Sequence, residues 1–345
     1  MKNLSELTWK DFKIENVFAV EKGIYLHQKD ILEGQIPYIT AKSINNGINA
    51  FIGNEKLFNK NTITIEKVKL SAFYQPTSYY CSHDVSVIKN DKLNKDNSLF
   101  IASMITRQGS KYSYGRQAQM NVVKRETLFC PIDDHREPDY EYMEDYTKSI
   151  IDKKLEKYKT YANSTLNSIK YKELEKLEDK EWKEFFLTDV FAKIQRGKRL
   201  ITSNQQDGNK PYVSSTALNN GIDNFISNQG SVRVFSNCLS IANSGSVGAS
   251  FYHPYEFVAS DHITHLKKED MSKFVYLFIS TLTNGLSKKY NFNREINDKR
   301  ISREKILLPV NDQEKPDYEY MEQYMKNLMH KKIKQYLDYL EKQSS

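Results

Sequence analysis

The residues best suited to metal-dependent hydrolysis are two aspartates and a lysine. Pro138-Asp139 precedes Asp152-x-Lys154, the residue types with which many nucleases hold a divalent cation. The stretch that contains them is expected to be helical, and a helix would place Asp139 and Asp152 about 20 Å apart. Because carboxylates that far apart cannot share one metal ion, the sequence predicts no catalytic role for them.

Histidine and cysteine residues offer two further kinds of site. Four of them lie near one another in the chain: Cys238, His253, His262 and His265. A zinc site needs four converging ligands, and residues three apart in a strand point to opposite faces, so polar residues of a sheet are the favoured interpretation. Two acid–base pairs are also present: His83-Asp84 and Asp261-His262. Their order is swapped and no nucleophile is implied, which favours structural pairing. We predict no catalytic residue and no metal ligand.

Two motifs of nucleotide chemistry are missing. The eight prolines are never adjacent, so the Asn/Asp-Pro-Pro-aromatic motif of amino-methyltransferases cannot occur. Gly197-Lys198-Arg199 has the lysine of a G-x-x-x-x-G-K-[ST] phosphate-binding loop but not the rest of it. The sequence therefore predicts neither a methyltransferase nor a nucleotide-driven motor.

Composition bounds the class of protein. The chain has 345 residues, 39% of them hydrophobic, which supports folded domains, and no apolar run long enough to cross a membrane. Three cysteines, odd in number and widely spaced, argue against a disulfide framework and for the cytoplasm. The net charge of +7 permits binding to a polyanion such as DNA without requiring it.

The chain is built from two copies of one unit. Seven residues, Pro-Asp-Tyr-Glu-Tyr-Met-Glu, occur at 138–144 and again at 316–322. Other matches keep the same order: Trp9-Lys10-Asp11-Phe12 with Trp182-Lys183-Glu184-Phe185, Pro37-Tyr38-Ile39-Thr40 with Pro211-Tyr212-Val213-Ser214, Asn45-Asn46-Gly47-Ile48 with Asn219-Asn220-Gly221-Ile222, and Tyr112 and Arg116 with Tyr290 and Arg294. We predict a first globular domain over 1–138, a central spacer helix over 139–180, a second globular domain over 181–316 and a C-terminal helix over 317–345. The two heptapeptides, at 138–144 and 316–322, lie too far apart in the sequence for a solenoid repeat, so they indicate a duplicated domain.

Each globular part is expected to mix α and β structure. The Asn-Asn-Gly-Ile segments predict turns, because Asn and Gly tolerate positive φ. Residues 73–88 and 251–266 alternate apolar and polar residues like half-buried strands, and 99–106 and 274–282 indicate short helices. After each heptapeptide, apolar residues recur at steps of three and four, the pattern of one helix face. We expect the two long helices to pack on each other as an antiparallel coiled coil.

This ordered, duplicated set of motifs resembles the specificity subunits of type I restriction–modification systems, and the related subunits of type IIB systems look closer in length. The resemblance covers essentially the whole chain. It implies an α/β mixed fold in which two α+β target recognition domains, separated by the long helices, each read one half of a bipartite, asymmetric DNA site. It also implies that methyltransferase subunits, expected as two, and restriction subunits as a further partner bind the helices. S-adenosylmethionine, and ATP or Mg, would then belong to those partners, and this chain would hold no cofactor.

Side chains able to contact DNA occur in both copies. Arg and Lys suit guanine or phosphate, and Asn and Gln suit adenine. The candidates are Lys42, Asn45, Arg107, Lys111, Arg116 and Gln117 in the first copy, and Arg196, Lys198, Arg199, Asn219, Asn243, Lys288, Lys289 and Arg294 in the second. The residues expected to bind partner subunits are Ile151, Leu155, Tyr158, Met325, Met329 and Tyr336.

Two other classes of function remain open at this point. One is an enzyme that works alone, either a nuclease or a methyltransferase, against which the missing motifs count. The other is a protein-binding scaffold that uses the same duplicated fold.

Overall fold

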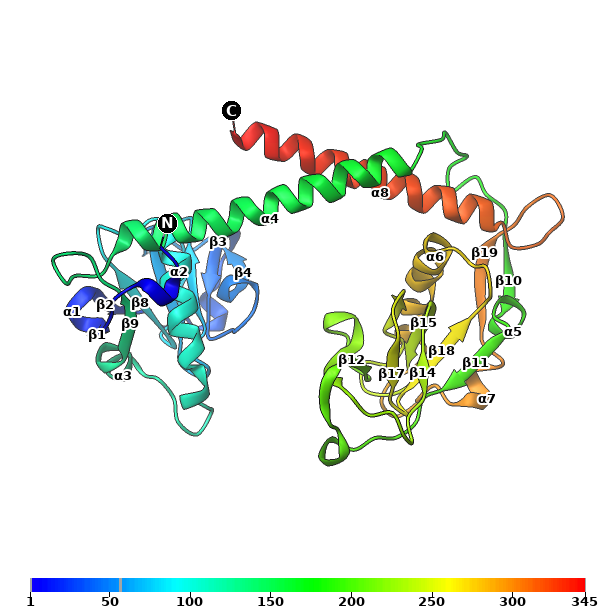
Figure 1. The fold of residues 1–345 in the computed structure, drawn as a ribbon, viewed down its shortest axis with the longest axis horizontal. Coiled ribbons are helices and arrows are strands. Elements are labelled where there is room, and N and C mark those ends of the chain that lie inside the picture. The colour runs from blue at the N-terminus through cyan, green and yellow to red at the C-terminus, as the bar shows by residue number, and fades with distance from the viewer. Residues whose placement is uncertain (1, 56–57, 345) are drawn as a thin grey trace. The chain divides into compact units, whose positions relative to one another are not determined.

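The computed structural model describes residues 2–55 and 58–344, which form two compact units divided between Tyr158 and Lys159 (Figure 1). In the first unit the strands are β1 (Trp9–Lys13), β2 (Ala19–Lys22), β3 (Glu33–Ile39), β4 (Ile48–Ile52), β5 (Thr62–Glu66), β6 (Ala72–Gln75), β7 (Tyr80–Cys81), β8 (Val85–Lys89) and β9 (Thr127–Pro131). Its helices are α1 (Ile14–Val17), α2 (Lys95–Thr106), α3 (Met120–Arg125) and the first part of α4 (Tyr140–Ser168), with 3₁₀ turns η1 (Leu4–Glu6), η2 (Gln28–Asp30), η3 (Asn45–Gly47) and η4 (Arg107–Lys111).

The second unit repeats this order. Its strands are β10 (Trp182–Phe186), β11 (Lys193–Arg196), β12 (Asp207–Val213), β13 (Ile222–Ile226), β14 (Val234–Phe235), β15 (Cys238–Ala242), β16 (Ser250–His253), β17 (Phe257–Ala259), β18 (Ile263–Lys267) and β19 (Lys305–Pro309). Its helices are the last part of α4, α5 (Leu187–Val190), α6 (Lys273–Asn284), α7 (Asp298–Ile301) and α8 (Tyr318–Ser344), with η5 (Thr202–Asn204), η6 (Asn219–Gly221) and η7 (Gly285–Lys288).

Sheet topology is the same in both units except for one extra strand in the second. The first has a β1-β9 pair, a four-stranded sheet β2-β8-β5-β6 and a three-stranded sheet β4-β3-β7. The second has β10-β19, β11-β18-β15-β16 and β13-β12-β17-β14. The extra strand β14 stands where the first unit has an isolated bridge between Phe58 and Tyr79. The predicted duplication of an α/β mixed domain is confirmed at the level of topology.

The four-stranded sheet of each unit is covered on both faces. In the first unit Ile63, Ile65 and Ile88 join the core that includes α2, whereas Val85 and Val87 join a second core under the three-stranded sheet. Burial on both faces explains why four of the five residues of β8 are buried. The alternating pattern over residues 73–88 therefore correctly indicated strands, but the strands are more deeply buried than predicted.

The two Asn-Asn-Gly turns are confirmed. Asn46 has φ +54° and Asn220 has φ +55°, and the following glycines, Gly47 and Gly221, have φ +76° and +77°. Such left-handed conformations are strained for most residues and favour Asn and Gly. Each turn carries the chain from a strand of the smaller sheet into its antiparallel neighbour.

Both long helices begin inside a globular core. Asp139 Oδ1 accepts a hydrogen bond from the Tyr142 amide at 2.9 Å, and Asp317 Oδ1 accepts one from Tyr320 at 3.0 Å, so each aspartate caps its helix. One turn further on, Met143 and its counterpart are fully buried in the respective cores. The heptapeptide thus joins each domain to its helix.

The central helix ends earlier than predicted. The sequence predicted helix as far as about Asp179, but α4 ends at Ser168. The segment that follows lies along α8, whose Asn327 accepts from the Lys172 amide at 3.1 Å and donates to the Lys172 carbonyl at 2.6 Å. Side chains of α8 thereby satisfy backbone groups that would otherwise need a helix. The antiparallel coiled coil of α4 with α8 stays a prediction.

Among the described residues, none of the helices combines the length and the apolar character that a membrane span requires.

Candidate nucleic-acid interface

A short, exposed turn follows the main helix of the first unit. Ser113 and Arg116 close it with reciprocal backbone hydrogen bonds of 3.2 and 3.0 Å. Tyr114 stands at its tip with 84% of its surface exposed. The Arg116 guanidinium lies 5.9 Å from the ring centre of Tyr112, within the range of a cation–π contact. The turn therefore presents one aromatic ring and one cation to solvent.

A carboxylate fixes the base of this turn. The Tyr112 hydroxyl donates to Glu126, and Lys111 Nζ lies 3.0 Å from Glu126 Oε2. Burial alone would raise the pKa of Glu126, but the bonds from Tyr112 and Lys111 outweigh it and hold that pKa below its ordinary value. Burial, with the bond to Glu126, raises the pKa of Tyr112 to about 12. Tyr112 and Glu126 are thus fixed as a neutral donor and an ionised acceptor at neutral pH.

The second unit builds the same turn from matching residues. The Tyr290 hydroxyl donates to Glu304 Oε2 at 2.5 Å, and Lys289 Nζ lies 2.8 Å from Glu304 Oε1. Arg294 lies 5.4 Å from the ring centre of Tyr290. Phe292 occupies the tip and is 76% exposed. The two units therefore share an aromatic residue, an arginine and a Tyr–Glu–Lys support.

A loop that differs between the units lies beside each turn. In the first unit this loop is formed by residues 67–71. The buried Glu66, which precedes it, accepts hydrogen bonds from the amides of Val68 at 2.7 Å and Lys69 at 2.6 Å. This loop contacts η4 so closely that a Cβ added at Gly109 would lie 2.2 Å from the Lys69 carbonyl oxygen. Beyond the turn, the Ala118 amide donates to the Lys67 carbonyl at 2.7 Å, so the loop contacts the chain on both sides of the turn.

The corresponding loop of the second unit, residues 243–249, is glycine- and serine-rich. Gly245 and Gly248 have φ +59° and +88°, and a Cβ at Gly248 would lie 2.7 Å from the Ser287 amide nitrogen. An open hollow of about 520 Å³ lies between this loop and the turn, bordered by Ser246, Asn284 and Phe292 among others. This surface offers hydroxyl and backbone groups where the first unit offers lysine.

The structure separates the fourteen predicted DNA-contact residues into four groups. Four lie in the two turns or at their support: Lys111, Arg116, Lys289 and Arg294. Six others are exposed near the turns or on other loops: Asn45, Arg107, Lys198, Arg199, Asn219 and Lys288. Lys42 and Gln117 are half-buried. The remaining two, Arg196 and Asn243, are held by the protein itself.

Asn243 does not fit the predicted role. It is 1% exposed, and its Oδ1 accepts from the Thr264 hydroxyl at 2.9 Å. Arg196 is only partly exposed, since its Nη2 donates to the Ile296 carbonyl at 3.3 Å and its Nε lies 3.3 Å from Asp298 Oδ1. The predicted cluster of Arg196, Lys198 and Arg199 therefore does not act as one exposed patch.

Sequence reasoning missed Tyr114 and Phe292, the two most exposed large hydrophobic side chains of the turns. A signal was available: each is the second residue after the matched tyrosine and the second before the matched arginine. Hydrogen-bonding and charged side chains suggest DNA contact by their type alone, whereas the type of an aromatic residue does not tell a core position from an exposed one.

The described residues contain no group of three or more His, Cys, Asp and Glu placed to hold a metal ion. Ser244 Oγ lies 2.5 Å from His262 Nδ1, but Asp261 is 4.0 Å from the other ring nitrogen, too far to orient it by a hydrogen bond. Asp139, once considered as a metal ligand, caps its helix instead.

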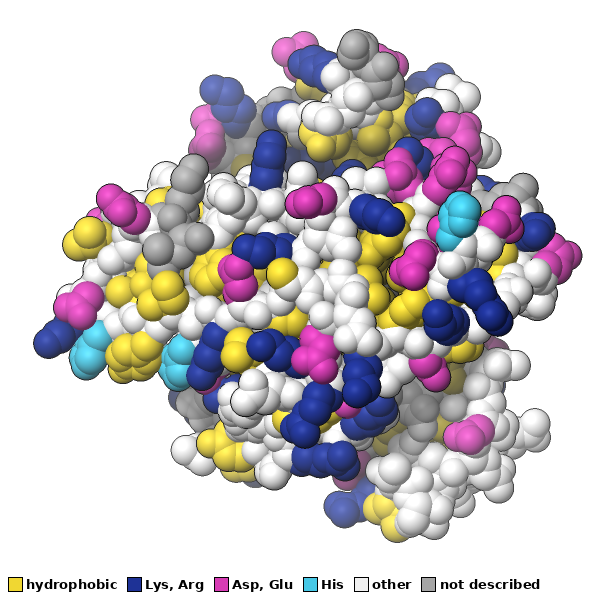
Figure 2. Space-filling view, turned by 90° about the vertical axis from the view of Figure 1, so that its left-hand side faces the viewer, with side chains coloured by type: hydrophobic (Ala, Val, Ile, Leu, Met, Phe, Trp, Pro, Cys, Tyr) yellow, Lys and Arg dark blue, Asp and Glu magenta, His cyan; other side chains and the backbone are white. Residues whose placement is uncertain are grey.

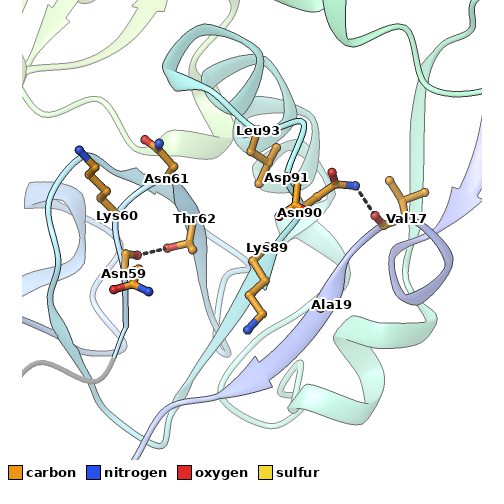
Figure 3. Close-up of a pocket in the computed structure, with 10 residues that line it drawn as sticks. All are labelled: Val17, Ala19, Asn59, Lys60, Asn61, Thr62, Lys89, Asn90, Asp91 and Leu93. Atoms are coloured by element: carbon orange, nitrogen blue, oxygen red, sulfur yellow. Dashed lines mark hydrogen bonds between the residues drawn. The ribbon is translucent and has the colours of Figure 1, made fainter.

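A hollow of about 620 Å³ lies in the first unit, and Figure 3 shows the residues that line it. Two of its polar residues bind backbone groups: Asn90 donates to the Val17 carbonyl at 2.7 Å and Thr62 to the Asn59 carbonyl at 3.2 Å. Lys89 at its edge pairs with Glu21. On the face drawn in Figure 2, Lys and Arg side chains gather in one region among scattered acidic ones.

The predicted partner-binding residues are divided between surface and core. Ile151, Leu155, Tyr158 and Met329 are half-buried, and Tyr336 is 40% exposed. Met325 is also half-buried and packs against the core of the second unit, so part of its side chain is already covered.

Two domains of one α/β topology, each with a basic aromatic turn and its own long helix, define a duplicated recognition protein. The model of the type I restriction modification DNA specificity domain matches residues 6–175 and again residues 179–338. The chain therefore belongs to this family and is a specificity subunit of a restriction–modification system.

Individual relatives agree with this assignment. The "Type II restriction enzyme BgcI specificity subunit S.BcgI" of Heyndrickxia coagulans is 30% identical over 342 residues, which cover 96% of this chain and 97% of the relative. The crystal structure of the S subunit of the type I restriction–modification system of M. genitalium has a TM-score of 0.53 at 17% identity. That match covers 99% of this chain and 94% of the other, and it supports the fold alone.

Proposed function

We propose that the chain reads a bipartite, asymmetric site in duplex DNA, with one half-site for each domain. The observation that carries this proposal is a pair of equivalent domains whose loops beside the turn differ in chemistry. Lys67-Val68-Lys69-Leu70-Ser71 in the first unit corresponds to Asn243-Ser244-Gly245-Ser246-Val247-Gly248-Ala249 in the second. A lysine donates only, whereas serine hydroxyls both donate and accept, so the two loops suit different base edges.

The long helices are proposed to bind two methyltransferase subunits. Apolar side chains exposed on them, including Ile150 at 37%, Leu328 at 38% and Tyr339 at 54%, support a protein-binding surface there. S-adenosylmethionine, and ATP or Mg, would be bound by the partner subunits, and this chain would recognise DNA without catalysing its modification or cleavage. The complex is proposed to act in the cytoplasm, where the three unpaired, buried cysteines would remain reduced.

Genome-wide mapping of modified bases tests the proposal. The chain would be co-expressed with its methyltransferase partner, and modified positions would be read by single-molecule sequencing. We expect a motif of two specified halves that differ in sequence and are separated by a fixed number of unread base pairs. A continuous motif, or two identical halves, contradicts the proposal.

Two matched substitutions assign the halves to the domains. Lys69→Ala removes an exposed ammonium group from the first loop, and Ser246→Ala removes a half-buried hydroxyl from the second loop. Each should relax one half-site and leave the other unchanged, because base contacts act locally whereas phosphate contacts act on all sequences. Relaxation of both halves by either substitution would count against the assignment.

A further inference from the structure

The two turns are alike where the neighbouring loops are different, and this contrast separates two kinds of contact. Both turns have an aromatic tip, an arginine over a tyrosine ring and a Tyr–Glu–Lys support. If the two domains read different half-sites, identical features cannot supply the difference. Contacts that are common to both halves of a DNA site are those to the phosphates, the sugars and the faces of the bases.

The aromatic tips lie outside the hydrophobic cores of their own domains. Tyr114 and Phe292 belong to none of the hydrophobic cores, and they are among the most exposed large hydrophobic residues of the chain. An exposed ring at the tip of a fixed turn is costly in water and gains free energy only from a ligand that covers it. Matching rings at matching positions in both units argue against chance exposure.

The charge around each turn indicates what that ligand is. Residues 105–126 contain five basic side chains and one acidic one, and residues 283–304 contain six basic and three acidic ones. Arg116 and Arg294 are within two residues of the exposed ring and are held over a tyrosine rather than in an ion pair. A basic turn with an exposed aromatic ring suits a polyanion with planar, apolar faces, which is nucleic acid.

The turns lie away from the long helices, so a ligand bound at a turn leaves the helix of the same unit accessible to a partner. In the first unit α2 begins where Asn94 contacts Glu144 of α4 at 2.5 Å, and its 12 residues carry the chain about 18 Å away before the turn. In the second unit α6 begins beside α8, with Lys326 5.5 Å from the ring centre of Phe274. A ligand at the turns and a partner on the helices would therefore not compete within either unit.

We propose that the turns 113–116 and 291–294 are sequence-neutral anchors on duplex DNA. The ring of Tyr114 or Phe292 packs on a base or sugar face, and Arg116 or Arg294 contacts a phosphate. The adjacent loops 67–71 and 243–249 read the bases. This inference rests on the proposed function, because it divides the labour within each recognition domain.

Binding by the full-length chain tests the anchors. The probes are a labelled duplex of random sequence, a duplex carrying the site mapped in the genome, and a randomised duplex library for selection. The double variant Tyr114→Ala/Phe292→Ala should bind both duplexes roughly ten-fold more weakly, as expected for lost aromatic contacts, and should select an unchanged motif. Arg116→Gln/Arg294→Gln should lower the slope of log affinity against log salt by about one unit per arginine.

The matched control is Phe129→Ala/Leu307→Ala, which truncates exposed apolar residues at equivalent positions of β9 and β19, away from the turns. It should bind as the wild type does, and thermal unfolding should show all variants folded. The inference is overturned if the tip variants bind normally, if they change the selected motif, or if the control weakens binding equally. Failure of the proposed function would appear separately, as a wild-type motif that is not bipartite.

Discussion

Equivalent positions of the two units are occupied by Gln75 and His253, and the difference has a measurable consequence. Gln75 donates to the Thr64 hydroxyl at 2.8 Å, and His253 Nε2 lies 2.8 Å from the Ser240 hydroxyl. Both are buried polar pairs between neighbouring strands. Only the histidine can titrate, and burial lowers its pKa to about 4.

The second unit should therefore lose stability in mild acid. His253 stays neutral in the folded state and is protonated in the unfolded state, so the free energy of unfolding falls as pH drops from about 6.5 to about 4, by about 3 kcal/mol. Hydrogen exchange of strands β15 and β16, compared with β5 and β6 between pH 7 and 4, measures this difference. His253→Gln should remove most of this dependence of the free energy of unfolding on pH. Burial also lowers the pKa of His265, which should account for the remaining dependence. Equal slopes in both units would contradict the prediction.

Residue type predicted some of the basic side chains that lie in the two turns or at their support. Charge and hydrogen-bonding capacity are visible in a sequence, so Lys111, Arg116, Lys289 and Arg294 could be named, and their contact with DNA stays a prediction. The prediction that Asn243 contacts DNA was wrong. Asn243 is buried and bonded to Thr264, a partner on a neighbouring strand that no local sequence pattern identifies. Composition and spacing alone do not tell a core aromatic residue from an exposed one.

At the scale of elements, the Asn-Asn-Gly turns depend on backbone conformation. Gly221 has φ +77°, and a Cβ there would lie 3.2 Å from a Val213 methyl group. Gly221→Ala should destabilise the second unit by about 1–2 kcal/mol, the cost of a left-handed conformation for an L-residue. Gly230→Ala is the control, since a Cβ there meets nothing within 4 Å and φ is not left-handed. Thermal unfolding measures both, and an equal effect of the two would refute the turn argument.

The helix face that carries Ile151 and Leu155 is the place to test partner binding. Both residues are half-buried on α4. Ile151→Asp and Leu155→Asp should weaken co-purification with the methyltransferase, because burying a carboxylate in an apolar interface costs about 2 kcal/mol or more. Asp152→Ala, at an exposed position of the same helix turn, is the matched control. Unchanged recovery of the partner with the aspartate variants would argue against this docking surface.

Element type was predictable and element limits were less so. The helices expected at 99–106 and 274–282 are α2 and α6, because apolar periodicity over a full helix is a strong signal. The end of α4 at Ser168 was not predicted, since the segment that replaces it is held by Asn327 and Gln323 of α8, far away in the sequence. Long-range side chains can satisfy a backbone that local propensity assigns to a helix.

At the scale of the whole molecule, the ordered repeats predicted the duplication of topology that the structure shows. They could not predict which loops would differ in conformation, because insertions such as the one between Asn243 and Ala249 break the alignment where function is expected to vary. The motifs that revealed the duplication consist of residues that build the shared fold of the two domains.

The spacing of the two half-sites should depend on α4. Deleting Asp152–Leu155, one helical turn, shortens the helix by about 6 Å, and in a complex that still methylates the unread gap should change by about two base pairs. Replacing the same four residues by alanine keeps the length and should keep the gap. Single-molecule sequencing of modified DNA measures the gap directly, and a gap indifferent to the deletion would sink the idea that α4 sets it.

The burial of Met143 and Met321 bears on how such a protein can be recombined. In each unit a tyrosine, a methionine and a second tyrosine at the start of the long helix contact the core: Tyr140, Met143 and Tyr146 in one, and Tyr318, Met321 and Tyr324 in the other. A domain cut at Pro138 or Pro316 would leave these side chains behind, yet it would meet the same three on the helix of the other half. Either domain could thus be transplanted onto either helix with its core complete, so new pairings of half-sites require no new helix.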